Sequence, residues 1–181
     1  RAHTLLLGVT EPLSIADVTW RDSATSANPI AGTFFHIACG YEKLVCRTIL
    51  GGETIYDRDG WVDRLPVDVD SEPNDPAFEA LSEDEYREIR AYVSSVLGEM
   101  EAFVVNLSAE QAAAGPAVED FGNGSVGELL IWPMLFHTTH HFGEISALRR
   151  VPRPNTVKAG PGGVELAILN GGTLWKIARK N

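Results

Sequence analysis

Residues 82–107 carry an apolar side chain at every third or fourth position, and no other feature of the chain constrains its fold as strongly. The apolar positions are Tyr86, Ile89, Val93, Val96, Met100, Phe103 and Leu107. Because an α-helix has 3.6 residues per turn, side chains at this spacing share one face. The initial Ser82-Glu-Asp-Glu85 matches a capping box, in which the serine and glutamate side chains accept free N–H groups at a helix start. The segment therefore predicts a long amphipathic helix that needs other helices to cover its apolar face.

Two stretches earlier in the chain predict helices that can cover this face. Residues 2–13 place leucine and valine side chains near helical spacing. The next predicted helix spans residues 29–50, with Asn28 as its N-cap and Pro29 at its first position, where the missing N–H costs nothing. Gly51-Gly52 ends it, since glycine readily adopts the left-handed conformation that follows a helix.

A fourth predicted helix spans residues 125–150. Ser125-Val-Gly-Glu128 is a second capping box at its start, and prolines lie just beyond its end. Inside it, Pro133 lacks the N–H that would bond the carbonyl of Leu129, so we expect the helix to bend or loosen there. The bend either aims the side chains that follow or is merely tolerated.

Composition and helix content together predict an all-α fold. The chain has 181 residues, of which 44% are hydrophobic, enough for one core. Few strand signals are present, so we predict a four-helix bundle over residues 1–151, with a long acidic loop, residues 53–81, between the second and third helices. We expect this loop to lie across one end of the bundle. The Gly/Pro-rich residues 152–181 are predicted to form an irregular C-terminal extension packed on or near the bundle, in which the apolar stretch 164–169 fits a strand or a short helix.

The charge of the chain argues against two classes of partner. The 15 Lys and Arg residues against 25 Asp and Glu give a net charge of −10, and the basic residues do not cluster beyond adjacent pairs. We therefore expect no nucleic-acid and no membrane partner. Gly122-Asn-Gly-Ser-Val-Gly127 matches a dinucleotide-binding pattern, but no buried strand leads into it, so we interpret it as a loop and a helix cap.

The uncharged apolar stretches of the chain are short. None approaches the roughly 20 residues that cross a bilayer, and the first residues lack the apolar core of a signal peptide. We therefore expect a cytoplasmic protein, although the chain begins with Arg1 rather than Met and its natural start is not fixed by this sequence.

Cys39 and Cys46 lie about 10 Å apart along one predicted helix, too far to pair with each other in a disulfide.

Two histidines and a carboxylate fall inside the apolar stripe of the fourth predicted helix. His137 and His141 are four residues apart, so their imidazoles project side by side and can bind one metal ion. Glu144 follows on the same face, whereas His140 lies on its flank. The alternative is a pair of core histidines bonded to backbone or water.

A third ligand would come from a facing helix, and His36 in the second predicted helix is the candidate. It lies at the border of the apolar stripe, and Gly32 and Gly40 beside it leave room for an ion and a ligand. The alternative is that these glycines merely permit close helix contact. Cys39, one turn away, could be a soft ligand, although a small buried cysteine is the commoner case.

These residues resemble the motifs of the DinB/YfiT-like superfamily of metal-binding four-helix bundles, which includes the N-terminal domains of mycothiol-dependent maleylpyruvate isomerases. The string His137-Thr-Thr-His-His-Phe-Gly-Glu-Ile145 is similar to the family's H-x-x-x-H followed by G-Q-I or G-E-I on the last bundle helix. Phe35-His-Ile-Ala-Cys-Gly-Tyr-Glu42 is similar to its W-H-x-A-x-x-E-D segment, with Phe35 in place of the usual Trp, and Asp59-Gly-Trp61 also matches. The resemblance covers roughly residues 1–151 and implies a DinB-like bundle.

The resemblance also implies a metal centre and a range of activities. His36, His137 and His141 would be the three ligands of one divalent ion, often zinc, nickel or iron in the family, with zinc or nickel expected here. Some members are S-transferases or isomerases that use a low-molecular-weight thiol such as mycothiol or bacillithiol, and others are hydrolases. We expect an enzyme of the thiol-dependent kind that acts on a small electrophile, with Glu144 orienting a ligand imidazole. The alternatives are a metal-dependent hydrolase and a non-catalytic metal- or small-molecule-binding protein of a stress response.

Three further residues are candidates for holding the thiol or the substrate. Arg47 or Arg58 would pair with carboxylates of the thiol, and Trp61 would cover an apolar electrophile. The alternative for Trp61 is an anchor that packs the loop onto the bundle. A small-molecule substrate is the expected partner, and a homodimer is left open as the oligomeric state.

Overall fold

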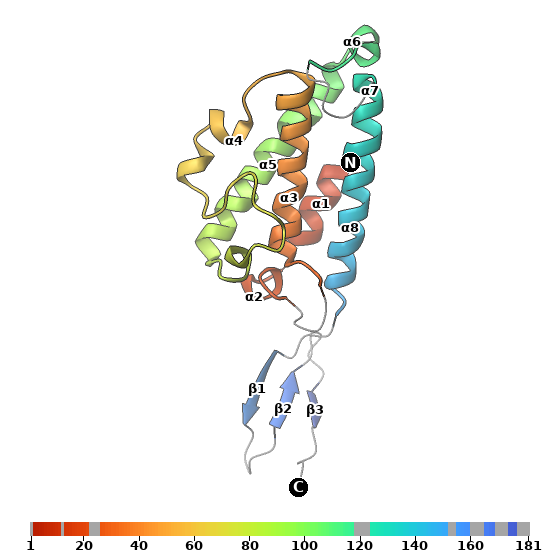
Figure 1. Ribbon diagram of the computed structural model, residues 1–181. Helices are drawn as coiled ribbons and strands as arrows, with labels where there is room; N and C mark the ends of the chain where they lie inside the picture. Colours follow the sequence, from red (N-terminus) through yellow and green to blue (C-terminus); the bar gives the residue numbers. More distant parts are fainter. Residues whose placement is uncertain are drawn as a thin grey trace. The chain divides into compact units, whose positions relative to one another are not determined.

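The computed structural model describes residues 2–11, 13–21, 26–117 and 124–151, together with three strand segments nearer the C-terminus. The chain divides into two compact units, Arg1–Ser146 and Ala147–Asn181. Up to Leu148 the described elements are all helical (Figure 1): α1 (Ala2–Thr10), α2 (Ile15–Val18), α3 (Ile30–Glu42), the π-helix η1 (Lys43–Ile49), α4 (Ile55–Arg58), the 3-10 helices η2 (Trp61–Asp63) and η3 (Pro76–Glu79), α5 (Glu83–Asn106), α6 (Ala109–Ala113), α7 (Val126–Leu129), the π-helix η4 (Leu130–Phe136) and α8 (His137–Leu148). The all-α class predicted from the sequence is confirmed.

The long amphipathic helix α5 forms where the sequence predicts it. The Ser82 hydroxyl accepts the Glu85 N–H, and the Glu85 carboxylate accepts the Ser82 N–H at 2.8 Å. The apolar face of α5 packs against α3, where the fully buried rings of Phe35 and Tyr92 lie with centroids 5.2 Å apart. Neither α5 nor any other described helix combines the length and the apolar character needed to cross a membrane.

Two predicted helix limits in the first part of the chain are wrong. α1 ends at Thr10, whose hydroxyl donates to the Leu7 carbonyl, and Ser14 then caps the separate short helix α2. A hydroxyl that bonds the preceding turn competes with the backbone and favours the helix end. α3 begins at Ile30, because Pro29 takes the N-cap position, with the extended ψ of 145°, that was predicted for Asn28.

Two of the predicted helices are present but are not α-helical throughout. η1 continues α3, and η4 joins α7 to α8, each with the wider turn of a π-helix. Pro133 lies inside η4, so the predicted loosening of this helix is confirmed. Without the proline N–H, the regular bond to the residue four positions earlier cannot form there.

The predicted cap of the last bundle helix is also present. The Ser125 hydroxyl accepts the Glu128 N–H at 3.3 Å, and the Glu128 carboxylate accepts the Ser125 N–H at 2.8 Å. The first two residues of the glycine-rich string, 122–123, lie outside the described residues. The remainder of the string forms the cap and the first helical residues, as interpreted from the sequence.

Replacing Ser125 with alanine is expected to lower the free energy of unfolding by about 1 kcal/mol, the usual cost of losing a serine N-cap. Urea denaturation followed by circular dichroism measures this loss as a lower midpoint. Ser108→Ala is the matched control, because Ser108 caps α6, a short helix without buried residues, and its effect should be smaller. A midpoint unchanged by Ser125→Ala would show that the cap does not support the helix.

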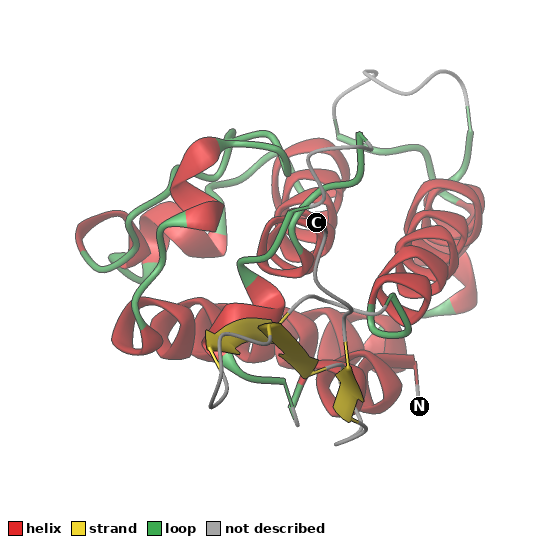
Figure 2. Ribbon diagram, turned by 90° about the horizontal axis from the view of Figure 1, so that it is seen from below, coloured by secondary structure: helices red, strands yellow, loops and turns green. Residues whose placement is uncertain are grey.

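The loop between α3 and α5 packs along the sides of these two helices, not across one end of the bundle as expected. The Pro73 carbonyl lies against Gly32 near the start of α3, and the Tyr56 N–H donates to Glu42 at the end of α3. Trp61 is buried against α5. Buried aromatic side chains need an apolar surface, and the helix sides provide more of it than the ends. The short helix α4 lies on the side of α3 away from α8 (Figures 1 and 2).

The second unit contains three short strands: β1 (Asn155–Ala159), β2 (Glu165–Ile168) and β3 (Leu174–Lys176). They form an antiparallel sheet in the order β1-β2-β3. The apolar stretch that fits either a strand or a short helix is therefore a strand, and the extension is more regular than the sequence suggests.

Candidate metal centre

Three histidine side chains from two helices converge in the first unit. His36 projects from α3, and His137 and His141 project from α8. The Nε2 atom of His137 lies 3.0 Å from the Nε2 atom of His36 and 3.0 Å from that of His141. One ligand atom from each ring can be chosen so that all three lie within 4.8 Å of one another. The spacing of four residues explains the pair on α8, whereas only the packing of α8 against α3 brings in His36.

We call these three residues the histidine cluster, and its environment favours neutral rings. Burial is the largest cause that lowers the pKa of His36, and it lowers the pKa of His137 to about 4. The neighbouring His141 acts in the same direction on both. Near pH 7 the rings of His36 and His137 are therefore neutral, and each has one nitrogen with a free lone pair.

Glu144 orients the ring of His141. Its Oε2 atom lies 2.6 Å from Nδ1 of His141, and its Oε1 atom lies 3.1 Å from Nε2 of the exposed His140. An ionised carboxylate only accepts hydrogen bonds, so Nδ1 of His141 carries the proton. In the neutral ring the lone pair is then on Nε2, which faces His137.

Hydrogen bonds within the cluster cannot satisfy all three Nε2 atoms. A proton on Nε2 of His137 can point at only one of the two neighbouring nitrogens. Without that proton, the lone pair of His137 faces the lone pair of His141 at 3.0 Å. A cation removes this conflict, because all three nitrogens can then offer it a lone pair. Two nitrogens bound at 2.0–2.1 Å to one tetrahedral zinc ion lie about 3.3–3.4 Å apart, so the observed separations of 3.0 Å are close to those of a metal site. The cluster could hold a metal ion.

Comparisons with known proteins agree with this fold. A family profile described as the DinB superfamily matches residues 1–145, which contain the whole histidine cluster. The chain belongs to the DinB superfamily. A crystal structure of a conserved protein from Enterococcus faecalis is similar to it, with a TM-score of 0.63 and 12% identity, covering 83% of this chain and 89% of that one. No curated protein matches the chain.

From the sequence, Gly32 and Gly40 were expected to leave open space beside His36. In this DinB-superfamily protein, neighbouring atoms occupy the space beside both glycines. A Cβ atom at Gly40 would lie 3.1 Å from Cε1 of His137, and one at Gly32 would lie 2.0 Å from the Pro73 carbonyl oxygen. Gly40 therefore admits the His137 ring, and Gly32 admits the loop. The alternative reading, in which the glycines permit close contact, is the one that the structure supports.

Cys39 lies away from the cluster in the apolar core. It is buried, and its Sγ atom is 3.5 Å from the Tyr92 hydroxyl. Burial raises the pKa of its thiol, which disfavours the thiolate that a metal would need. Cys46 is also free and buried, in agreement with the expectation that the two do not pair.

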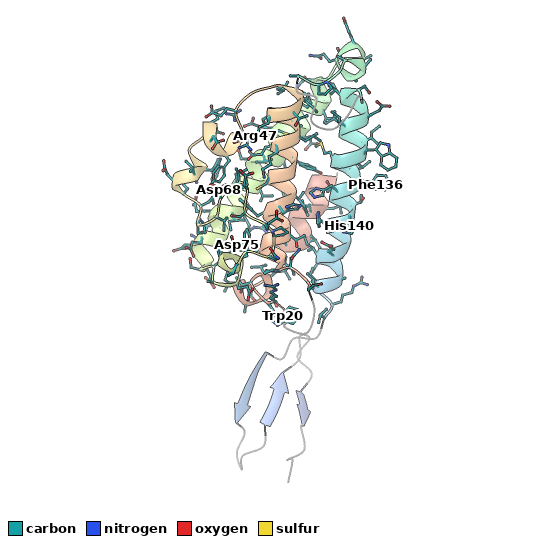
Figure 3. The ribbon with its side chains drawn as sticks, viewed as in Figure 1. Trp20, Arg47, Asp68, Asp75, Phe136 and His140 are labelled. Carbon is teal, nitrogen blue, oxygen red and sulfur yellow. The ribbon has the colours of Figure 1, made fainter. Side chains whose placement is uncertain are left out.

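The three residues suggested for the thiol and the substrate lie in contacts of their own. Arg58 bonds Glu99 of α5 at 2.5 Å. Arg47, which is labelled in Figure 3, lies 3.6 Å from the Asp57 carboxylate of α4. Trp61 is buried against α5, as its alternative role of loop anchor requires. Within the part of the chain that the structure describes, no polar contact joins these three to the histidine cluster.

Lys43 is a charged residue near the cluster that the sequence analysis did not single out. Its charge lowers the pKa of His36, whereas that of Glu72 in the loop raises it. The Lys43 ammonium lies 2.5 Å from the Asp70 carboxylate, which is also 3.9 Å from the Arg47 guanidinium. Lys43 comes two helical turns after His36 on the same face. This spacing could have predicted from the sequence that Lys43 lies near the cluster.

Glu42 is a fully buried carboxylate that the sequence analysis named only as part of a motif. It accepts hydrogen bonds from the Tyr92 hydroxyl at 2.9 Å and from the Tyr56 N–H at 3.0 Å. Burial raises its pKa to about 7, although these hydrogen bonds act in the opposite direction. Glu42 thus joins α3 to α5 and to the start of α4. The sequence could have pointed to Glu42, because it is the only Asp, Glu, Lys or Arg in residues 30–42.

Proposed function

We propose that this chain is a metal-dependent enzyme that holds one divalent ion, zinc or nickel, in the histidine cluster and uses a low-molecular-weight thiol to transform a small electrophile. One observation carries the proposal: three Nε2 atoms converge, and no arrangement of their protons satisfies all of them. The thiol is chosen because the motifs around His36 and His137 resemble those of the superfamily, and some members of the superfamily use such a thiol. A cytoplasmic location, where thiols are kept reduced, belongs to the same proposal.

The chain's own residues would prepare the site for this chemistry. His36, His137 and His141 would hold a divalent ion, which when bound would lower the pKa of a thiol or water molecule that it binds. Glu144 holds the His141 ring in one orientation by accepting its Nδ1 proton. Gly40 lets the His137 ring approach α3, so that both histidines of α8 reach His36.

Lys43 is the cation that we propose for binding an acidic group of the thiol. Its side chain is 35% exposed and its partner Asp70 is 65% exposed. Ion pairs this exposed contribute about 0–1 kcal/mol, so an incoming carboxylate can displace Asp70. Arg47 shares the same Asp70 carboxylate and extends the basic side chains along the helix. Arg58, bound to Glu99 and Asp59, is not needed for this role.

Titration of the cobalt-loaded protein with low-molecular-weight thiols tests the proposal. A thiol that carries carboxylates should produce a sulfur-to-cobalt charge-transfer absorption band, and this band should be absent in His36→Ala. Lys43→Gln should weaken the apparent thiol affinity several-fold without shifting the band, whereas Arg58→Gln, the matched control, should leave the affinity unchanged. Cobalt binding without a response to any thiol would contradict thiol-dependent chemistry and favour a hydrolase or a non-catalytic binding protein.

A further inference from the structure

His140 and Glu144 form a polar pair on the surface of α8. The Nε2 atom of His140, which is labelled in Figure 3, lies 3.1 Å from Oε1 of Glu144. Residues four apart on an α-helix are neighbours on one face, so both side chains can reach one ion at the same time. Imidazole nitrogens and carboxylate oxygens are both ligands of zinc in proteins. The pair is therefore a candidate metal-binding pair outside the three nitrogens of the histidine cluster.

The separation of these two atoms suits two ligands of one metal ion. At bond lengths of about 2.1 Å, two ligand atoms lie about 3.0 Å apart when the angle at the metal is 90° and about 3.4 Å apart at the tetrahedral angle. The observed 3.1 Å falls between these values. The side chains of His140 and Glu144 are 69% and 40% exposed, so water molecules can fill the remaining coordination positions.

The two nitrogens of the His141 ring face different neighbours. Nε2 of His141 lies 3.0 Å from Nε2 of His137, whereas Nδ1 lies 2.6 Å from Oε2 of Glu144. Nδ1 carries the proton that Glu144 accepts, so it has no lone pair for another ion. Oε1 of Glu144 lies beside His140 instead. An ion bound by His140 and Glu144 would therefore be distinct from an ion bound by the histidine cluster.

No basic side chain on the same helix competes for Glu144. Residues 124–146 contain no lysine and no arginine. Among the described residues, the ion pairs of Glu144 are those with His140 and His141. The net charge of −10 attracts cations to the chain as a whole. A divalent ion at this pair would thus replace a proton between His140 and Glu144, not the cationic side chain of a lysine or an arginine.

We propose that His140 and Glu144 bind a second divalent ion, which we call the surface ion, and that it and the ion of the histidine cluster weaken each other's binding. Imidazole suits zinc, nickel and copper, whereas magnesium and calcium prefer oxygen ligands, so the surface ion belongs to the first group. With two protein ligands in place of three, it is the weaker of the two ions. The surface site does not depend on the proposed function, but the coupling between the ions rests on it.

The Glu144 carboxylate connects the two ions. It accepts the Nδ1 proton of His141 through Oε2 and would bind the surface ion through Oε1. A cation on this carboxylate makes it a weaker acceptor, so the His141 ring becomes a less basic ligand for the cluster. The two positive ions also repel each other. Because coupling between two bound ligands is reciprocal, the ion of the cluster weakens the surface ion by the same factor.

Calorimetric titration of the full chain with zinc, without a histidine tag, tests the surface site. The wild type should bind one tight ion and one weaker ion, and His140→Ala should lose the weaker ion alone. Thr139→Ala is the matched control and should bind both, because the exposed Thr139 hydroxyl bonds carbonyls of its own helix. Magnesium should not displace the weaker ion. A wild type without a weaker ion, or a weaker ion that survives His140→Ala, would overturn the proposal.

His137→Ala, which removes the tight ion, tests the coupling. This variant should keep the surface ion and bind it several-fold tighter than the wild type does, because the ion of the cluster is absent. His137→Ala combined with His140→Ala should bind neither ion, and an ion retained there would show that the surface site is wrong. Equal affinities for the surface ion in His137→Ala and the wild type would contradict the coupling. A wild type that binds only the weaker ion would contradict the proposed function, not the surface site.

Discussion

Replacing His137 with alanine is expected to lower the affinity for zinc or nickel more than about 100-fold while the helices still form. Removal of a group that only orients a ligand costs about 10–100-fold, so the loss of a ligand should cost more. His137 is the central member of the cluster, 3.0 Å from both other Nε2 atoms. Calorimetric titration and elemental analysis after dialysis measure the metal, and circular dichroism measures the helices.

Two variants on the same helix separate ligands from their neighbours. Glu144→Ala should weaken metal binding by about 10–100-fold, because the His141 ring loses the acceptor of its Nδ1 proton. His140→Ala should have little effect, since this side chain is 69% exposed and bonds the same carboxylate from outside. An equal loss in His140→Ala would show that the ligands on α8 are wrongly assigned. A reconstituted wild type that retains no ion would favour hydrogen-bonded core histidines instead.

Replacing Glu42 with alanine is expected to lower the free energy of unfolding at pH 5 by about 3 kcal/mol or more. The variant leaves the Tyr92 hydroxyl and the N–H groups of Ile55 and Tyr56 without their acceptor. A buried donor without a partner costs about 1–3 kcal/mol. Urea denaturation at pH 5, where the carboxyl group of the folded protein is protonated, separates this loss from the cost of burying a charge. A loss below 1 kcal/mol would show that water reaches these donors.

The pH dependence of stability should identify the same carboxyl group. The folded protein binds the Glu42 proton more tightly than the unfolded chain, because its pKa is about 7 instead of about 4.3. The Glu42 contribution to the free energy of unfolding should therefore fall as the pH rises from about 4.5 to above 7, by roughly 3 kcal/mol. In Glu42→Gln this fall should be missing, so the variant should gain stability relative to the wild type between pH 5 and pH 8. Parallel curves for the two proteins would contradict the raised pKa.

The caps of two helices could be predicted to the residue. The capping boxes at Ser82 and Ser125 form as expected because each donor and acceptor lies within four residues of its partner. The same locality explains why His141 and Glu144 share a face, which the helical period alone requires. The start of α3 was misplaced by one residue: Pro29 takes the N-cap position without a side-chain capping bond, although local preference favours Asn28 as the cap and proline at the first helical position.

Contacts between distant segments were the main gap in the prediction. His36 was expected beside His137 at one metal ion, but helical periodicity gives only the face of α3 on which His36 lies, since the contact joins residues 101 positions apart. The two glycines beside His36 illustrate the same limit. A glycine can leave a cavity or admit a neighbour, and only the positions of Pro73 and His137 decide that both neighbours are admitted.

The sequence by itself determined where most of the long helices lie, how two of them are capped and which face of α8 carries His137, His141 and Glu144. These properties depend on interactions within one or two helical turns. Only the tertiary structure decided that the loop runs along α3 and α5, that Glu42 is buried against Tyr92, and that large apolar side chains of η4 such as Trp132 are exposed. The physical reason is that burial and side-chain pairing between segments depend on how whole helices pack. A repeating apolar pattern predicts that one face of a helix is covered, but it does not identify the segment that covers it.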